Sequence, residues 1–295
     1  MNRFSIKDVE NLTGIKAHTL RIWEQRYGIV VPHRTDTKIR YYSSNDLKQI
    51  LKIALLNQHG YKISRIKSIS EEEMNELLHK TSNSEFQYNI LINDLLEATI
   101  DMDTYRFDMM LNSYIKKNGI EQTIEQLVFG FLEKVGILWM SDHIMPAHEH
   151  LVSNIIVRKI ISAIEKVQQK PQPEQTKYLL FLPEAENHET GLLYVQYFLL
   201  KQGKNVVYLG SDTPIDQVQY VSKELNIKNL YTHVTAGSGN FDIARYIKKL
   251  AELHPNCNIM ISGLVVQRRK LMNLPSNVTI LHSLSEVKTH LYKSL

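Results

Sequence analysis

The sequence predicts a multidomain protein of the α and α/β classes: an N-terminal winged helix-turn-helix, a four-helix bundle and a C-terminal doubly wound parallel sheet. Three observations favour this organisation. The N-terminal part is basic and orders two helices before a hairpin, the middle has only helical periodicity, and the C-terminal part alternates short β-rich runs with helices. For 295 residues we expect three domains, spanning residues 1–80, 81–170 and 171–295.

Composition and charge narrow the class of protein. Hydrophobic residues make up 43% and charged residues 22% of the chain, as in soluble globular proteins. No apolar run could span a bilayer and the N-terminus lacks the apolar core of a signal peptide, so we expect a cytoplasmic protein without a membrane partner. The single cysteine, Cys257, rules out a disulfide within the chain and is expected to be a buried thiol.

The first domain begins with two helices joined by a glycine turn. Residues 6–12 form an amphipathic pattern that Ser5 can cap, Gly14 marks a turn, and a second helix is expected over residues 16–27. This order is typical of a helix-turn-helix. The following segment, 30–42, has β-prone ends around a polar tip and predicts a hairpin, or wing.

Three further helices are expected in this domain. One begins after Ser43 or Ser44 and ends at Gly60, and a short one covers about 62–68. A capping pattern at Ser70 and Glu73 opens the third.

Positive charge is concentrated in this part of the chain. Residues 1–67 hold thirteen Lys and Arg against five Asp and Glu, a net charge of +8, although the whole chain carries only +4. A basic module on an acidic remainder indicates a polyanionic partner for that module. Leu20 and Trp23 are expected on the buried face of the second helix. The candidate DNA-contacting residues are Lys16, His18, Thr19, Arg21, Arg26 and Tyr27 on the helix, and His33, Arg34, Lys38, Arg40 and Tyr41 on the wing.

Residues 4–67 resemble the MerR superfamily of transcriptional regulators. The segment TLRIWEQRYG matches its recognition helix, and the arginine-containing wing that runs through IRYYS into the next helix matches its wing. The resemblance implies a dimer on a pseudo-palindromic double-stranded operator, with Arg21, Arg26 and Tyr27 at the groove and backbone. The chain has neither the cysteine pair nor the long coiled coil of the metal-sensing relatives, so we expect another ligand.

The middle of the chain predicts a four-helix bundle. Polar linkers are expected at 81–84 and 169–176. The helices between them are expected at 85–98, 103–118, 120–138 and 145–168, with short connections.

The last domain alternates strands and helices, which predicts a parallel sheet covered on both faces. The expected strands are 177–183, 205–210, 229–235, 258–263 and 278–283. The expected helices are 190–202, 214–225, 240–253 and 285–293.

A candidate ligand site follows the first of these strands. His188 lies at its carboxyl end, where doubly wound sheets bind ligands, and a neutral imidazole binds transition metals well. Glu186 can hydrogen-bond the second ring nitrogen, and Gly191 permits close backbone approach. From spacing alone, a surface-loop histidine remains the alternative.

The pattern Glu186-x-His188-x-x-Gly191 resembles the signature of flavodoxin-like cobalamin-binding domains, which implies that His188 is the lower cobalt ligand. In that family an S-x-L and a G-G sequence line the path of the nucleotide tail. They align here with His233-Val234-Thr235 and Ser262-Gly263, which keep only Gly263. The residues expected to line the tail pocket are Gly210, Thr235, Gly237, Ser238 and Gly263.

A second pattern lies in the predicted bundle. Trp139 is followed after nine residues by Glu149-His150, which is similar to the CarH/LitR group of adenosylcobalamin-dependent light sensors. The resemblance implies that these three residues contact the adenosyl side of the cofactor. The alternative is a core tryptophan near two solvated polar residues. Met140 stands where light sensors of this group have a histidine that captures cobalt after illumination.

Together these patterns predict a DNA-binding regulator, a repressor rather than an enzyme, which forms dimers or tetramers under the control of adenosylcobalamin and light. One alternative is the same architecture without dependence on cobalamin or light, controlled by a protein partner. Another is a corrinoid carrier for methyl transfer, against which the winged helix argues.

Overall fold

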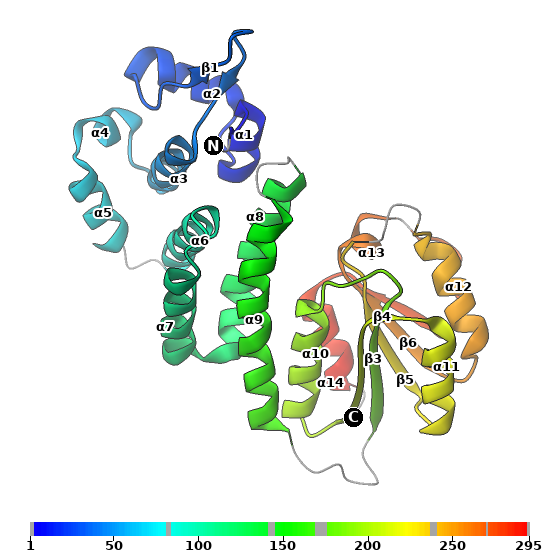
Figure 1. Cartoon of the computed structure of the whole chain (residues 1–295). Coiled ribbons are helices and arrows are strands. Elements are labelled where there is room, and N and C mark those ends of the chain that lie inside the picture. The colour runs from blue at the N-terminus through cyan, green and yellow to red at the C-terminus, as the bar shows by residue number, and fades with distance from the viewer. Residues whose placement is uncertain are drawn as a thin grey trace. The chain divides into compact units, whose positions relative to one another are not determined.

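The computed structural model describes residues 3–80, 84–140, 145–168, 176–236, 241–269 and 271–293. The chain forms two compact units, Met1–Ile156 and Val157–Leu295 (Figure 1). The first contains the helix-turn-helix and most of the helical region, and the second contains the sheet.

The N-terminal head, residues 3–80, has the predicted helix-turn-helix. Helix α1 (Ile6–Thr13) starts at a capping box between Ser5 and Asp8 and ends at Gly14, which has a left-handed φ of 73°. Helix α2 (Ala17–Ile22) runs directly into a π-helical turn, η1 (Trp23–Tyr27), which the sequence did not predict. Leu20 and Trp23 are only 5% and 6% exposed, so their predicted burial is confirmed.

The predicted wing is a small antiparallel hairpin of β1 (His33–Arg34) and β2 (Arg40–Tyr41). Helix α3 (Ser44–Gln58) begins at Ser43, whose side chain forms a second capping box with Asp46. Helices α4 (Ile63–Ser68) and α5 (Glu71–Lys80) complete the head.

The helical region follows as α6 (Ser84–Ile100), α7 (Thr104–Gln122), the π-helical η2 (Thr123–Val128), α8 (Phe129–Met140) and α9 (Pro146–Val167). The predicted break near residue 119 is a kink at Gly119, where φ is 79°. Phe107 and Phe131 pack with their ring centroids 5.3 Å apart in the interior. Helix α3 packs on α6 and α1 on α8, and Lys48 forms an ion pair with Asp101 at 2.6 Å, so the head and this region share one unit.

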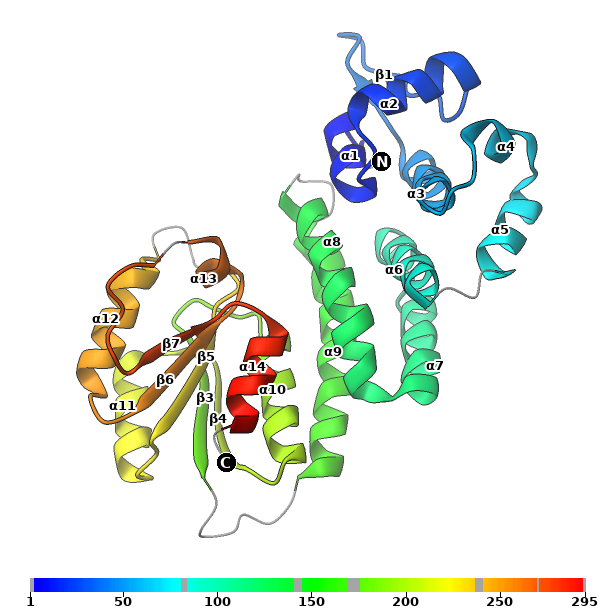
Figure 2. The ribbon, with the colours of Figure 1, turned by 180° about the vertical axis from the view of Figure 1, so that it is seen from behind.

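The second unit is the predicted doubly wound sheet. Its strands are β3 (Lys177–Pro183), β4 (Asn205–Thr213), β5 (Asn229–His233), β6 (Asn258–Ser262) and β7 (Val278–Leu281), all parallel in the order β4-β3-β5-β6-β7. Helices α10 (Thr190–Lys201) and α14 (Leu284–Lys293) cover one face, and α11 (Ile215–Glu224) and α12 (Ile243–Leu253) cover the other (Figures 1 and 2). A short helix, α13 (Leu264–Arg268), lies in a stretch without a predicted element.

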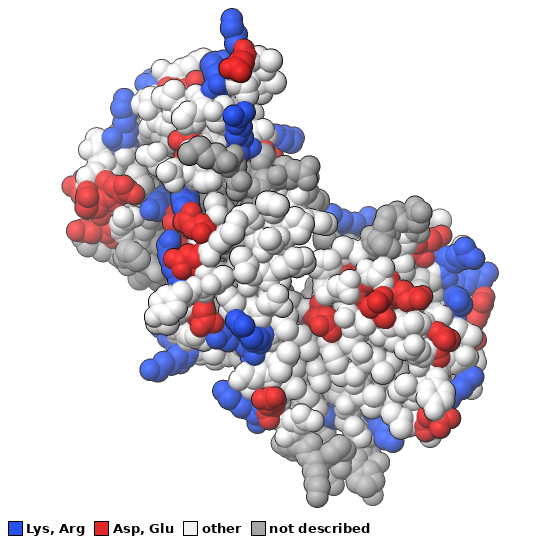
Figure 3. Space-filling model, in the orientation of Figure 1, with Lys and Arg blue, Asp and Glu red and all other residues white. Residues whose placement is uncertain are grey.

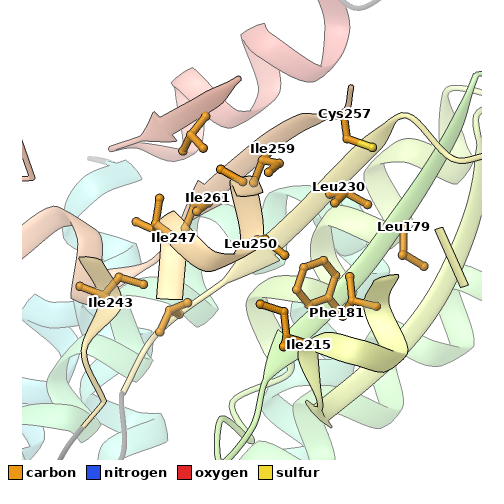
Figure 4. Close-up of a cluster of buried hydrophobic side chains, with 14 of the residues drawn as sticks. Leu179, Phe181, Ile215, Leu230, Ile243, Ile247, Leu250, Cys257, Ile259 and Ile261 are labelled. Carbon is orange, nitrogen blue, oxygen red and sulfur yellow. The ribbon is translucent and has the colours of Figure 1, made fainter. Parts of the chain in front are cut away.

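Strand alternation fills the two faces of the sheet. Leu179 and Phe181 of β3 pack with residues of α11 and α12 (Figure 4). The intervening Tyr178 and Leu180 pack with α10 and α14. Cys257 is buried at the edge of the first cluster, as expected, and burial raises the pKa of its thiol.

Candidate functional site

The centre of the candidate site is the buried carboxylate of Glu186, in the loop between β3 and α10. Its side chain is 2% exposed. Its Oε2 accepts hydrogen bonds from the backbone N–H groups of Thr235 (2.9 Å) and Ala236 (2.7 Å), which follow β5. The strand order reverses between β3 and β5. Glu186 therefore joins the two loops at the point where doubly wound sheets bind ligands.

The same carboxylate orients His188. Nδ1 of the imidazole lies 2.6 Å from Glu186 Oε1, and the His188 backbone N–H also donates to that oxygen at 3.0 Å. Burial would raise the pKa of Glu186, but the hydrogen bonds from His188 and Ala236 outweigh it and hold the pKa below its usual value. An ionised Glu186 favours the His188 tautomer with its proton on Nδ1, which leaves the lone pair on Nε2. Because the His188 side chain is 47% exposed, this arrangement suits a metal ligand.

Gly191 lies under a second histidine. A Cβ atom built on Gly191 would be 2.5 Å from Nε2 of His233, so the imidazole rests directly on the glycine. Nδ1 of His233 lies 2.7 Å from the Ser262 hydroxyl, which is 2.5 Å from the Tyr231 hydroxyl. Burial lowers the pKa of His233 to about 4, so the ring is neutral at pH 7.

Two more glycines allow close approaches at this edge of the sheet. Gly263 has a φ of 108°, and a side chain there would overlap the backbone of Val234. Gly210 has a φ of 83°, and a Cβ atom on it would lie 3.2 Å from Oε1 of Glu189. Any other residue at these two positions would be strained.

The loop that carries Glu186 is also held from β4. Asp212 accepts a hydrogen bond from the Ala185 N–H at 2.8 Å, and its own N–H donates to the Glu186 carbonyl at 3.2 Å. Both Ala185 and Asp212 have positive φ angles, of 63° and 52°. Sequence reasoning missed Asp212, because only the paired strands bring it to the loop.

The structure thus connects several predicted residues and leaves others apart. Glu186 contacts both His188 and Thr235, and Gly191 and Gly263 each contact the segment that ends β5. Gly237 and Ser238 lie outside the described residues. His233 and Ser262 appeared in the sequence only as departures from a pattern, yet here they form the contact over Gly191.

The candidate residues of the helical region belong to the first unit. Trp139, near the end of α8, is 48% exposed, which contradicts the alternative of a core tryptophan. Glu149 and His150 are in the first turn of α9, with 3.2 Å between His150 Nδ1 and Glu149 Oε2. The side chain of Met140 lies outside what the structure describes.

The candidate DNA-contacting residues divide into exposed and anchored groups. Arg21, Arg26, Arg34 and Lys38 are exposed, as are Lys16 and His18. Figure 3 shows Lys and Arg side chains at the outer end of the head, where Figure 1 places the hairpin.

The half-buried members of the set are anchored within the head. Arg40 pairs with Glu24 at 3.3 Å, which ties the wing to η1. Tyr41 stacks on His33 with ring centroids 5.3 Å apart. Thr19 and Tyr27 are also half-buried. The exposed group can therefore reach a nucleic acid, and among the half-buried group Arg40 links the wing to η1.

Comparisons with known proteins agree with both parts of this description. Residues 4–73 match the family described as "MerR HTH family regulatory protein", and residues 91–164 match "B12 binding domain". The chain joins a MerR-type helix-turn-helix to a B12-binding domain. The resemblance to MerR regulators and the presence of a B12-binding domain are thereby confirmed. The B12-binding match lies in the helical region and does not include Glu186 or His188.

Two similar regulators come from Myxococcus xanthus. The HTH-type transcriptional repressor CarA is 26% identical over 220 residues, which cover 72% of this chain and 70% of CarA. The HTH-type transcriptional repressor CarH is 24% identical over 221 residues, which cover 73% of each chain. The chain is thus a homologue of two HTH-type transcriptional repressors.

The fold also matches a solved structure. The monomethylamine corrinoid protein of Methanosarcina barkeri superposes with a TM-score of 0.57 at 14% identity, over 70% of this chain and 98% of that one. Together with the two family matches, it confirms the predicted fold class. None of the described helices has both the length and the apolar character needed to cross a membrane.

Proposed function

We propose that this protein is a transcriptional repressor whose assembly and operator binding are controlled by adenosylcobalamin and by light. The observation that carries the proposal is the Glu186–His188 pair. A buried carboxylate orients a half-exposed imidazole at the ligand-binding edge of a sheet, in a chain that also has a MerR-type head.

The second unit would hold cobalt through His188. With its proton on Nδ1 and shared with Glu186, the imidazole presents the Nε2 lone pair as the lower ligand. When bound, adenosylcobalamin supplies a cobalt–carbon bond that green light can break. Glu186 also fixes the loop after β5, through Thr235 and Ala236, so coordination at His188 and the order of that loop are linked.

The remaining candidates are assigned to the two sides of the corrin ring. Trp139, Glu149 and His150 would contact the adenosyl side, and the exposed indole supports this role. The nucleotide tail would pass beside Gly210, Thr235, Gly237, Ser238 and Gly263. Met140 stands at the position of the capturing histidine, and a thioether is a softer and generally weaker ligand for oxidised cobalt.

The head would bind double-stranded DNA as a dimer. The recognition helix would contribute Lys16, His18, Thr19, Arg21, Arg26 and Tyr27, and the wing would contribute Arg34, Lys38, Arg40 and Tyr41. We propose that the chain comprises three domains, at 1–80, 81–170 and 171–295.

We also propose that cobalamin favours a larger assembly, a tetramer. A ligand that binds one assembly more tightly shifts the population toward it, and losing the adenosyl group removes that preference.

The test uses the full chain in the dark. Purified protein is mixed with adenosylcobalamin and passed through a size-exclusion column, and absorbance, mass and operator binding are measured before and after green light. We expect retained cofactor, a larger assembly and operator binding in the dark, and loss of the last two after illumination. Failure to retain the cofactor would refute the sensor proposal, and an assembly indifferent to light would refute the photoreceptor.

The cobalt ligand is tested with a matched pair of variants. His188→Ala should change the absorbance bands that depend on the lower ligand. His282→Ala replaces another exposed histidine, which follows β7 at the same edge of the sheet, and should leave the spectrum unchanged. An unchanged spectrum in His188→Ala would show that another group binds cobalt.

One observation favours a second candidate function. The His233 ring lies on Gly191, along the path that the resemblance gives to the nucleotide tail. A regulator of the same architecture that responds to a protein partner instead of cobalamin would need no such path. The retention measurement above separates the two candidates.

A further inference from the structure

The imidazole of His233 occupies the space directly over Gly191. The position of a Cβ atom on Gly191 lies 2.5 Å from Nε2, 2.7 Å from Cδ2 and 2.9 Å from Cε1 of His233. Three ring atoms therefore occupy the space that a side chain at position 191 would need. Gly191 is needed here to make room for this chain's own side chain.

The ring is held in that place from two strands. Its Nδ1 lies 2.7 Å from Ser262 Oγ at the end of β6, and Ser262 Oγ lies 2.5 Å from the hydroxyl of Tyr231 on β5. Tyr231 and Ser262 are 1% and 3% exposed, so both hydroxyls are removed from water. A hydrogen bond to a buried hydroxyl is costly to break unless another partner replaces it.

The imidazole of His233 is chemically similar to the base of the nucleotide tail that it would exclude. The nucleotide tail of cobalamin ends in a benzimidazole, which contains an imidazole ring. In the resemblance above the tail passes the positions aligned with His233 and Ser262, where a serine and a glycine leave space. Here an imidazole and a hydroxyl stand at those positions.

We propose that His233 takes the place of the nucleotide base, so that this domain binds corrinoids by the corrin ring and cobalt, and a base-bearing tail enters only by displacing His233 from Ser262. This inference rests on the corrinoid binding proposed above. It names the ligand class favoured by the site: corrinoids with a short tail or without the nucleotide.

The experiment compares two corrinoids on the full chain. Aquacobalamin carries the nucleotide, and aquacobinamide lacks it. Cobalamin must also release its own base from cobalt before His188 can bind, so the preference of the unmodified protein alone proves nothing. The informative quantity is the change in the ratio of the two dissociation constants when His233 is replaced.

We expect His233→Ser to tighten cobalamin binding at least tenfold and to leave cobinamide binding unchanged. Ser262→Ala keeps the ring but removes its anchor, and should shift the ratio the same way by a smaller factor. The matched control is His254→Ser, because His254 is also a histidine next to a buried serine hydroxyl, 3.1 Å from Ser222 Oγ. It precedes β6 rather than following it, and should leave the ratio unchanged.

The outcomes separate this inference from the proposed function. An unchanged ratio in a folded His233→Ser or Ser262→Ala protein overturns the inference and leaves corrinoid binding intact. Failure of the unmodified protein and the variants to bind either corrinoid overturns both. If the variants fail to fold, hydrogen exchange on the unmodified protein decides: cobalamin, but not cobinamide, should accelerate exchange at the ends of β5 and β6. Equal exchange with both ligands would overturn the inference.

Discussion

Replacing Gly191 by alanine tests the packing of the site without any cofactor. The new methyl group would lie 2.5 Å from Nε2 of His233, closer than real side-chain contacts allow. Gly191 is in α10, where its φ is not in the left-handed region. Alanine is favoured over glycine in a helix by roughly 0.5–1 kcal/mol, so any loss of stability must come from the contact with His233.

The expected loss follows from what His233 must give up. Moving the ring breaks its partly buried hydrogen bond to Ser262, whose hydroxyl is buried, which costs about 1–3 kcal/mol. Crowding of the surrounding core adds about 1–3 kcal/mol. After the helical gain of alanine, the net loss should be about 1–5 kcal/mol. In a His233→Ser background the methyl group has room, so Gly191→Ala should then be neutral or slightly stabilising.

The assay is a double-mutant cycle by urea unfolding of the full chain. Both tryptophans, Trp23 and Trp139, belong to the first unit, so fluorescence serves as an internal control that should not change. Circular dichroism follows the second unit as well. We expect a coupling energy of at least about 2 kcal/mol between the two substitutions. Additivity within about 0.5 kcal/mol would refute the contact between the ring and the glycine.

Three further predictions concern helix α3, the titration of His233 and the wing. Ser43→Ala removes the capping box of α3 and should destabilise the first unit by about 1 kcal/mol, measured by tryptophan fluorescence in urea; an unchanged midpoint would contradict the cap. The pKa of His233 falls from 6.5 to about 4 on folding, so between these values the unfolded chain binds more protons. Stability of the second unit should therefore be complete above pH 6.5 and decrease by up to about 3 kcal/mol toward pH 4, and His233→Ser should flatten this dependence. Arg34→Ala should weaken binding to all DNA sequences and reduce the slope of log affinity against log salt by about 1, whereas Lys248→Ala in the second unit should not.

The fold could be predicted from the sequence because its strands and helices have regular hydrophobic patterns. The runs that became β3 and β6 are continuously apolar, and the helices between strands are amphipathic, so alternation alone indicated a parallel sheet. The ends of elements were less predictable. Residue 235 was expected in a strand, but β5 ends at His233. The N–H of Val234 still donates to the Ser262 carbonyl of β6, whereas the N–H groups of Thr235 and Ala236 turn to the Glu186 carboxylate. The π-helical turns have no distinct sequence pattern and were missed.

The candidate site was predictable only where its residues are close in sequence. Glu186 and His188 are two positions apart, so their hydrogen bond follows from local geometry. The contact of Gly191 with His233 depends on β3 and β5 being neighbours in the sheet. It also depends on the hydrogen bond with Ser262, which holds the orientation of the His233 ring. From the sequence, His233 is only a missing serine. In the structure the His233 ring lies over Gly191 and next to Ser262. A ligand with a nucleotide tail would have to displace this ring. A pattern comparison would count the departure against corrinoid binding. The His233 ring lies over Gly191, so in our proposal the departure affects the nucleotide tail and leaves His188 in place as the cobalt ligand.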